Sequence, residues 1–420
     1  MKEADEPVEE VTLPLETIGR WRSTFSSLSI ADYRWYWFST LGAFTAMQMS
    51  LFVQGLLIFE LTNSAVALGL VSAAFGVPML LFSLWGGAVV DRADKRNVLI
   101  VTQALSFAAT LAVGILIALD MISFWHLLAA SFINGLVLSF NLPGRQAILP
   151  QLVGRERIMN AVALASGAVN SSRIFAPAMG GLLVGFMGID GIYFLIAAFY
   201  LASVLLLFMI PALGKPVRPS SVSVRSDIRE GLTYIKGSPI LLGLLVLAFV
   251  PVVFGMPYQM LMPVFAVDVL GMGRTELAFL LAMTGVGAVL GSMGIASLGE
   301  FRHKGLLLLV SCALFGAFLI FFAQSTSYLL SLFLLVAVGA ANVTYLTANN
   351  TLLQVHCDDA MRGRVMSLYM MTIGLMPVGT LGISAIAEWA GAPLAVAAGG
   401  AFILVFALAM TLFSGTLRRL

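Results

Sequence analysis

Long apolar stretches, separated by short polar segments, make up most of the chain after its first 34 residues. Each stretch has roughly 20 residues or more, the length that an α-helix needs to cross about 30 Å of hydrocarbon. The stretches are continuous rather than alternating, which excludes a transmembrane β-barrel. The pattern predicts twelve spans, at 35–60, 65–90, 97–119, 123–143, 160–187, 191–213, 239–267, 275–298, 305–324, 327–350, 362–387 and 390–413.

Polar segments divide these spans into two sets of six. The segment 214–238 predicts a linker between an N-lobe at 35–213 and a C-lobe at 239–413. The polar ends predict an N-terminal tail at 1–34, which lacks the order of a signal peptide, and a C-terminal tail at 414–420. Two repeated six-helix halves are a known transporter plan, with the binding site near mid-membrane between them.

Composition strengthens the membrane assignment. Of the 420 residues, 60% are hydrophobic and only 10% are charged, whereas soluble proteins have about 25% charged residues. The mean hydropathy of +0.99 leaves too few polar side chains to cover a soluble globule. A soluble enzyme, a disordered protein and a coiled coil are therefore excluded. A net charge of only +2 gives no support to a nucleic-acid partner.

The basic residues predict how the chain is oriented, because cytoplasmic loops carry the excess of Lys and Arg. If both termini are cytoplasmic, all but two of the 23 lysines and arginines fall in cytoplasmic segments. The exceptions are Arg274, in an outer loop, and Arg173, inside a span. One missed helix would destroy this asymmetry, so we expect cytoplasmic N- and C-termini.

The second span ends in the most specific local motif of the chain. Its sequence is Gly87-Ala-Val-Val-Asp91-Arg92-Ala-Asp94-Lys95-Arg96. Gly87 allows a neighbouring helix to approach closely, and Asp91 is an anion suited to cap a helix N-terminus. The motif resembles the G-x-x-x-D-R-x-x-[RK]-[RK] loop of the major facilitator superfamily, at that family's position between spans two and three.

This resemblance implies an all-α integral membrane protein with twelve transmembrane helices in two six-helix lobes, the major facilitator fold. It also implies that Asp91 latches against the start of span eleven, near Arg362 and Arg364, in the outward-facing state. On the alternative interpretation, the loop is a basic turn that only sets topology. The gating residues expected from it are Gly87, Asp91, Arg92, Lys95 and Arg96.

Span five contains a second motif. It reads Asn170-Ser-Ser-Arg173-Ile-Phe-Ala176-Pro177-Ala-Met-Gly180-Gly181. It is similar to the G-P-x-x-G-G motif of drug:proton antiporters, with Ala176 in place of the first glycine. We expect Pro177 to kink the span, and Gly180 and Gly181 to permit tight helix contact during gating. The resemblance implies export; the alternative is that these are ordinary packing glycines.

Looser similarities run from about residue 30 onward and resemble the bacterial exporters of enterobactin and of macrolides. The similar segments are 32–37, 60–65, 143–150, 257–263 and 362–367. A lysophospholipid-moving relative is close to this branch. The resemblance therefore implies a bacterial inner-membrane efflux protein, with amphipathic cargo in general left open.

Arg173 is the one charge predicted deep in the membrane. Counted from Asn160, it lies about 20 Å into its span, close to mid-depth. An arginine there costs about 2.5–3.5 kcal/mol on insertion scales, so it is expected to face protein or a water-filled cavity. Two hypotheses stay open: Arg173 meets an anionic group of the cargo or responds to a proton, or it is a structural strut between helices.

By resemblance, spans one, four, seven and ten line the central cavity. They carry uncharged polar residues at helical spacing, interleaved with Met and Phe side chains that adapt to varied apolar shapes. Each polar residue is explained equally well as a hydrogen bond between helices, but the set favours a cavity. The expected substrate-binding residues are Gln48, Gln54, Asn134, Asn141, Arg173, Tyr258, Gln259, Asn342, Tyr345 and Asn349.

No Asp or Glu is predicted at mid-membrane, where proton relays usually place one. Asp91, Glu60 and Asp268, each at a membrane edge, are the remaining candidates for a proton carrier. The sequence contains no nucleotide-binding G-x-x-x-x-G-K-[ST] loop, no metal-ligand cluster and no G-x-S-x-G elbow. We therefore expect no catalytic residue, no cofactor and no bound metal.

Together these features predict a secondary transporter that exports a small amphipathic molecule by alternating access. The resemblance implies a multidrug type of antiporter driven by the proton gradient. The expected partners are the substrate, protons and membrane lipid, and the protein is expected to act as a monomer. The alternatives are a lysophospholipid or nutrient transporter of the same fold, or a membrane-embedded lipid enzyme, for which the sequence shows neither a nucleophile–base pair nor a metal site.

Overall fold

The computed structural model describes residues 26–212, 224–298 and 303–418, which are almost entirely helical. The first half contains η1 (Ser26–Ser29), α2 (Ala31–Thr62), α3 (Ala65–Arg92), α4 (Lys95–Ala118), α5 (Phe124–Val153), η2 (Arg155–Arg157) and α6 (Ile158–Phe208). The second half contains α7 (Val224–Lys236), α8 (Pro239–Phe254), η3 (Met256–Gln259), α9 (Met262–Val264), η4 (Phe265–Val269), α10 (Arg274–Leu298), α11 (Lys304–Gln324), α12 (Tyr328–Val355), α13 (Asp359–Ile373), α14 (Met376–Ala390), α15 (Ala392–Phe413) and α16 (Gly415–Arg418).

These helices make twelve membrane passes. Within the described residues, ten helices are long and apolar enough to cross a bilayer. One of the ten, α6, has 51 residues, about twice the length that a membrane needs, and it turns back at Gly188, whose φ of 71° suits glycine. Helices α13 and α14, separated near Gly374, supply the remaining pass. The predicted all-α membrane fold is confirmed.

The fourth predicted span ends too early. Helix α5 continues through Pro143 and Pro150 to Val153, ten residues beyond the predicted end at 143. Proline is tolerated in a membrane helix where neighbouring helices satisfy the freed backbone groups. The extension carries Arg145, which the basic-residue count placed in a cytoplasmic segment, into the interior of the protein, where its side chain is buried.

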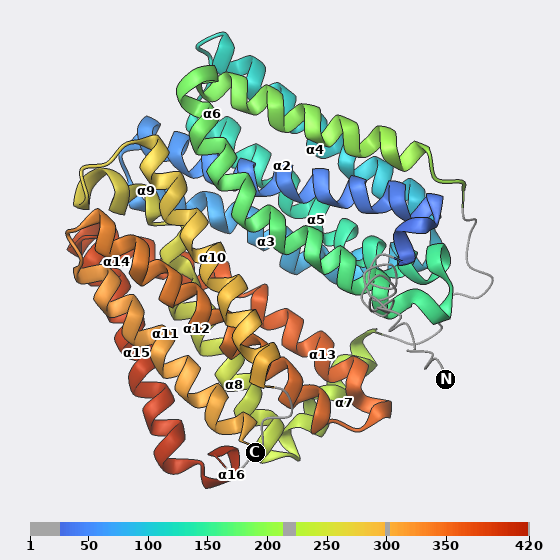
Figure 1. Cartoon of the computed structure of the whole chain (residues 1–420), viewed down its shortest axis with the longest axis vertical. Helices are drawn as coiled ribbons and strands as arrows, with labels where there is room; N and C mark the ends of the chain where they lie inside the picture. The colour runs from blue at the N-terminus through green and yellow to red at the C-terminus, as the bar shows by residue number, and fades with distance from the viewer. Residues whose placement is uncertain (1–25, 213–223, 299–302, 419–420) are drawn as a thin grey trace, which may run out of the picture.

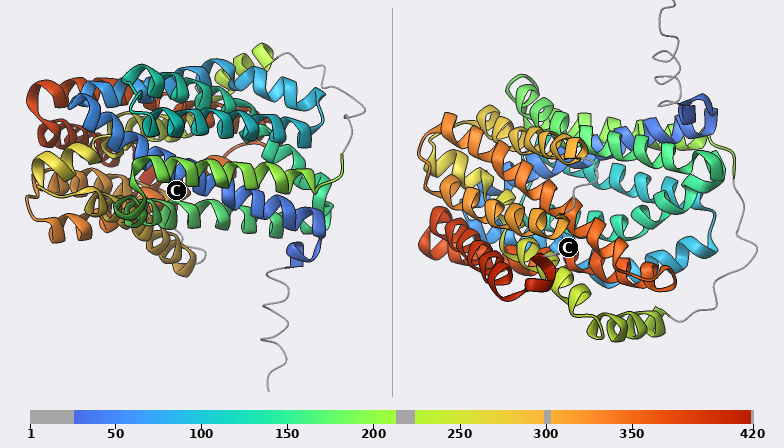
Figure 2. Two further views of the ribbon diagram at one scale, coloured as in Figure 1. Left: turned by 90° about the horizontal axis from the view of Figure 1, so that it is seen from above. Right: turned by 60° about the horizontal axis from the view of Figure 1, so that its bottom comes forward.

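The helices pack in two groups (Figure 1). Helices α2–α6 pack against one another and form what we call the N-bundle, and α8–α15 form the C-bundle. Figure 2 shows the helices of both groups running in roughly the same direction. The amphipathic helix α7 packs on α8 and α13. The predicted tails at 1–34 and 414–420 and the linker at 214–238 lie partly outside the described residues, and the lobe boundaries stay a prediction.

Large apolar side chains cover the outer surface of the bundles. Trp125, Phe186, Trp389 and Phe413 are each at least 71% exposed. On a water-soluble protein such exposure would mark an aggregation-prone surface, but on a membrane protein it faces lipid.

We name the two ends of the bundles by their elements. The linker end is where α2 begins, α6 ends and α7 lies. The opposite end holds the turns at 63–64, 119–123, Gly188 and Gly391. We call it the closed end, because the contacts between bundles described below lie towards it.

Candidate functional site

A buried arginine forms the centre of a polar cluster in the N-bundle. Arg145, on α5, is only 5% exposed. Its Nε donates a hydrogen bond to Asn141 Oδ1 at 2.9 Å, and its Nη1 donates to Thr40 Oγ1 on α2 at 2.6 Å. The guanidinium lies 5.8 Å from the ring centroid of Tyr36 and 5.7 Å from that of Phe44, within the range of a cation–π interaction.

The cluster is neutral apart from this arginine. Asn141 donates from Nδ2 to Thr102 Oγ1 at 2.9 Å, and Thr102 donates to a backbone carbonyl of its own helix, α4. Among the described residues no carboxylate lies within ion-pair distance of Arg145, and its Nη2 is buried with no hydrogen-bond partner. The cation therefore has aromatic and neutral polar neighbours but no counter-charge.

Two cavities share Arg145 as a wall. The smaller one, of about 50 Å³, lies towards the middle of the N-bundle. The larger one, of about 530 Å³, lies between α2, α5 and the first pass of α6, in the half of the bundle nearer the linker end. Its size falls in the range of small-molecule sites, roughly 300–1,000 Å³. Its walls include Tyr36, Phe44, Gln146, Ser166 and Asn170.

Three of the predicted substrate-binding residues line the smaller cavity, namely Gln54, Asn134 and Asn141. In this state each is also hydrogen-bonded to a neighbouring helix. Gln54 Nε2 donates to Leu127 O and to Ser131 Oγ, and Asn134 Oδ1 accepts from Ser106 Oγ. The structure thus brings these amides together and shows them joining helices, while their contact with a substrate stays a prediction. Gln48 is half-buried.

The predicted C-bundle residues do not line either cavity. Tyr345 is fully buried, and its hydroxyl donates to Ala248 O on α8 at 3.1 Å. Asn349 is also fully buried, and neither of its amide atoms has a partner among the described residues. Tyr258 is buried edge-on against Phe322, whereas Asn342 is half-buried and Gln259 is exposed.

Arg173 is exposed, and no described residue forms a hydrogen bond or ion pair with it. It lies on α6 at three and seven residues from Asn170 and Ser166, and so on the same helical face as these two residues of the larger cavity. Both hypotheses for Arg173 stay open, although it has no protein partner of the kind that a strut requires.

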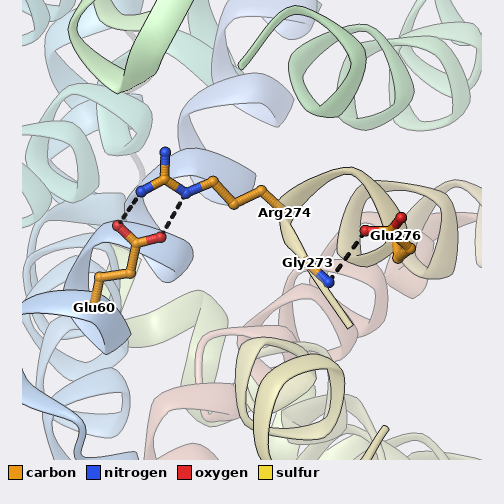
Figure 3. Close-up of polar contacts among 4 residues, drawn as sticks. All are labelled: Glu60, Gly273, Arg274 and Glu276. Atoms are coloured by element: carbon orange, nitrogen blue, oxygen red, sulfur yellow. Dashed lines mark hydrogen bonds and ion pairs between the residues drawn. The ribbon is translucent and has the colours of Figure 1, made fainter. Parts of the chain in front are cut away.

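The closed end is held by polar contacts between the bundles. Arg274, the first residue of α10, forms a two-pronged ion pair with Glu60 on α2, with N···O distances of 2.7 and 2.8 Å (Figure 3). Glu276 accepts a hydrogen bond from Gly273 N at 3.1 Å and so fixes the turn that presents Arg274.

A second polar contact joins α14 to the start of α3. Glu388 Oε2 accepts from Ser64 Oγ at 3.0 Å and from Val66 N at 3.1 Å. A C-bundle carboxylate thus caps an N-bundle helix at its positive end.

Small residues let the bundles approach closely on this side. A Cβ added at Gly76 on α3 would overlap the ring of Pro377 on α14, and one added at Gly69 would lie within 3.0 Å of Ser384 on the same helix. A similar close contact joins α6 to α10, the second pair of helices between the bundles. A Cβ added at Gly181, in the span-five motif on α6, would overlap Ala278 on α10.

Other residues of the span-five motif contact both bundles: a Cβ added at Gly285 on α10 would overlap Ile174, whereas Pro177 and Gly180 pack within the N-bundle. A Cβ added at Gly180 would press on Phe52. Pro177 is buried, and α6 continues through it with helical dihedral angles. Tight contact at both glycines is therefore present in this state.

The linker-end motif differs in part from its prediction. In this state a Cβ at Gly87 would meet nothing within 4 Å. The close helix approach occurs instead at Gly86, where a Cβ would overlap the backbone of Ser139 on α5. Among the described residues no close helix contact is made at Gly87 in this state, and the predicted contact there stays a prediction.

The basic residues of the motif pack mainly within the N-bundle. Arg96 donates to Leu207 O and Phe208 O at the end of α6, which satisfies carbonyls that a helix C-terminus leaves free. Lys95 is buried, and Arg92 is exposed.

The latch itself stays a prediction, because the side chains of Asp91 and Arg362 lie outside the described part of the structure. Arg364, the other expected partner of Asp91, forms an ion pair with Glu230 on α7 at 3.2 Å.

Two residues of the site were not predicted. Arg145 was assigned to a loop by its charge, although Asn134, Asn141 and Arg145 follow one another at spacings of seven and four and so share a helical face. Gln103, on α4, lines the smaller cavity with a buried Oε1 that has no partner among the described residues. Its span was not among those expected to line the cavity.

Twelve passes in two bundles that meet towards one end, with two cavities in the N-bundle, are the architecture of a secondary transporter of the major facilitator superfamily. Residues 22–418 match the family described as transmembrane secretion effector, and the chain belongs to this family. It is a transporter and not an enzyme.

Curated relatives and solved structures agree with this assignment. The enterobactin exporters EntS of Shigella boydii serotype 18 and of Escherichia coli O1:K1 are each 27% identical over 319 residues, which is 74% of this chain and 74% of the relative. The nucleoside transporter NupG covers 91% of the chain and 99% of its own length, at 14% identity and a TM-score of 0.70. A bacterial homologue of the lysosomal transporter Spinster, in an inward-facing and unoccupied conformation, covers 94% of the chain and 98% of its own length, at 16% identity and a TM-score of 0.71.

Proposed function

We propose that the protein exports an amphipathic small molecule across the bacterial inner membrane by alternating access, with proton antiport as the driving force. The main support for this proposal is the position of the larger cavity. The bundles meet towards the closed end, while this cavity lies in the half of the N-bundle nearer the linker end. In this state the cargo enters the cavity from the linker end.

The distribution of Lys and Arg supports a cytoplasmic linker end. Arg92, Arg96 and Arg157 lie there, and the tails and linker carry further basic residues. Burial of Arg145 removes one charge from the cytoplasmic set but adds none to the outer side. The state described here is therefore inward-facing, as an exporter must be when it loads.

The cargo is expected to be amphipathic because the cavity walls are mixed. Phe44, Leu149 and Val169 provide apolar surface, while Gln146 and Asn170 provide hydrogen-bonding groups. The relatives named above export enterobactin, so siderophore-like molecules are included among the cargoes to be tested, together with macrolides and other drugs.

Two carboxylates on a pair of packed helices provide a gate for each end. Glu388, at the end of α14, caps the start of α3 when the closed end is shut. The family motif assigns the reciprocal contact to Asp91, at the end of α3, with the start of span eleven when the linker end is shut. Each contact must break before the other forms, which couples the two ends.

Proton coupling then acts at the edges of the membrane. Glu60, Asp91 and Asp268 are the candidate carriers, since the described residues contain no carboxylate deep between the bundles. Protonation of Glu60 would break its ion pair with Arg274 and so favour opening of the closed end.

Everted membrane vesicles test this function, because their cytoplasmic face is outside. With an acid interior, vesicles containing the protein are expected to accumulate rhodamine 6G, erythromycin or enterobactin, and a protonophore is expected to abolish the accumulation. Asp91→Asn is expected to reduce it about tenfold or more, while Arg34→Gln, an exposed arginine on α2, serves as the matched control.

Two results would contradict the proposal. Accumulation only in right-side-out vesicles would show uptake, and accumulation that a protonophore does not change would exclude proton antiport. Transport of lysophospholipid, with no transport of rhodamine 6G, erythromycin or enterobactin, would show that the cargo is a lipid and not one of the proposed molecules.

A further inference from the structure

The charge of Arg145 is not balanced by the protein. Its Nε and Nη1 are held by Asn141 and Thr40, two neutral acceptors, and its Nη2 is buried without a partner among the described residues. An unpaired charge in a membrane interior is costly and is usually found where a pathway or a ligand requires it.

A purely structural role explains only part of this geometry. A structural arginine is expected to have its donors satisfied, because a half-satisfied buried polar network is worse than an apolar one. Here Asn141 and Thr40 fix the plane of the guanidinium, while the hydrogen-bonding capacity of Nη2 is left over. The cluster therefore holds the arginine in one orientation and leaves the hydrogen-bonding capacity of its buried Nη2 unused in this state.

The surroundings of Arg145 suit an anion with an aromatic or apolar body. The two rings of Tyr36 and Phe44 flank the guanidinium, and both contribute to the wall of the 530 Å³ cavity. No Asp or Glu occurs among the described residues that line either cavity. An anion would therefore meet a cation and aromatic faces but no negative charge.

Arg173 adds a second cation on the same side. It lies one turn beyond Asn170 on the face of α6 that contributes Ser166 and Asn170 to the cavity. It is exposed and has no described partner. Arg173 lines neither cavity in this state, but an anion that moves from Arg145 along this face of α6 towards the closed end would meet this second cation.

We propose that Arg145 binds the anionic group of the transported molecule, so that the cargo of this transporter is an amphipathic organic anion with a carboxylate or similar oxyanion. Nη2 donates to one oxygen of the anion, and Tyr36 and Phe44 contact its apolar body. This inference rests on the proposed function and narrows it from amphipathic molecules in general to anionic ones.

Equilibrium binding to the full chain in lipid nanodiscs tests the inference without requiring transport. Fluorescein and rhodamine 123 share a xanthene ring system, but at pH 8 the first is anionic and the second is not. Fluorescence anisotropy is expected to show fluorescein binding about tenfold or more tightly than rhodamine 123, because a charge-assisted hydrogen bond is gained only by the anion.

Variants of Arg145 then locate the preference. Arg145→Gln is expected to weaken fluorescein binding about tenfold or more and to change rhodamine 123 binding less than about twofold. Arg145→Lys, which keeps the charge but not the planar fork, is expected to fall between the wild type and Arg145→Gln. Arg34→Gln removes an exposed arginine from α2, the helix that contributes Thr40 to the cluster, and this variant is expected to bind both dyes like the wild type.

The thermal unfolding of each variant separates recognition from support of the fold. Fluorescein is expected to raise the melting temperature of the wild type and of Arg34→Gln but not of Arg145→Gln, measured against each variant's own value without dye. Unchanged fluorescein binding in Arg145→Gln, tighter binding of rhodamine 123 than of fluorescein by the wild type, or binding of neither dye would each overturn the proposal.

Failure of this inference differs from failure of the proposed function. Proton-driven accumulation of rhodamine 6G in everted vesicles, with no preference for fluorescein in nanodiscs, would leave the exporter intact and reject the anion site. Selective binding of fluorescein through Arg145, with accumulation only in right-side-out vesicles, would keep the anion site and reject export.

Discussion

At the scale of single residues, the buried polar groups of this protein divide into those that are satisfied and those that are not. Tyr345 donates its hydroxyl to a carbonyl of a neighbouring helix and has no unused polar group facing a cavity. Arg145 keeps an unpartnered Nη2 beside two cavities. We therefore assign Tyr345 to the stability of the C-bundle and Arg145 to recognition.

Tyr345→Phe tests this division. Loss of the hydrogen bond to Ala248 is expected to reduce the free energy of unfolding by about 1 kcal/mol, the usual net value of such a bond. The melting temperature in detergent is expected to fall, while the affinity for fluorescein stays as in the wild type. Reduced affinity at an unchanged melting temperature would instead support the prediction from sequence that Tyr345 binds the substrate.

Some of the site was predictable from residue type and spacing. Gln54, Asn134 and Asn141 were expected at a cavity because they are amides in helices that cross lipid, and the structure places them on one cavity wall. Arg145 was not, because the positive-inside rule describes where charged residues lie on average and assigns a charge near a predicted helix end to the loop. Only the packing of α2 against α5 shows that this arginine is buried.

At the scale of elements, the contact between α3 and α14 changes between states if access alternates. Gly76 leaves room for the ring of Pro377, and Glu388 caps the first turn of α3. Both contacts join the bundles and lie between the middle and the closed end. They stabilise the state described here and must separate in the opposite state.

A larger side chain at Gly76 is therefore expected to shift the equilibrium between states. Gly76→Leu would overlap Pro377 only while the closed end is shut, and a penalty of about 1.4 kcal/mol corresponds to a tenfold shift. Ala65, beside the Glu388 contact, is only 6% exposed in this state. Labelling of a cysteine at this position by a membrane-impermeant maleimide is expected to become about tenfold faster in the Gly76→Leu variant.

The control for this variant is Gly382→Leu. Gly382 lies on α14, but an added Cβ would meet nothing within 4 Å. In the Gly382→Leu variant, the introduced cysteine is expected to be labelled at the same rate as in the protein without this substitution. An equal acceleration in both variants would mean that the contact at Gly76 does not hold the closed end shut.

At the scale of the whole molecule, the two bundles meet where α3 packs on α14 and α6 packs on α10, and polar contacts join them at the closed end. The number of passes followed from the lengths of the apolar stretches, which a bilayer fixes closely. The sequence did not reveal that α5 extends to Val153, because proline is a weak stop signal in membrane helices. Nor did it show which end is shut, since that depends on pairs far apart in the chain, such as Glu60 with Arg274.

The central claim, that the two ends open in turn, is tested most directly by distances between spin labels in proteoliposomes. Cysteines at Leu61 and Trp389 report on the closed end, and cysteines at Val89 and Phe413 on the linker end; all four sites are exposed, whereas Cys312 and Cys357 are buried. We predict two distance populations at each end. When a pH gradient is imposed, the population with the longer closed-end distance is expected to grow together with the population with the shorter linker-end distance. A single unchanging distance at both ends, or widening of both ends together, would contradict the account.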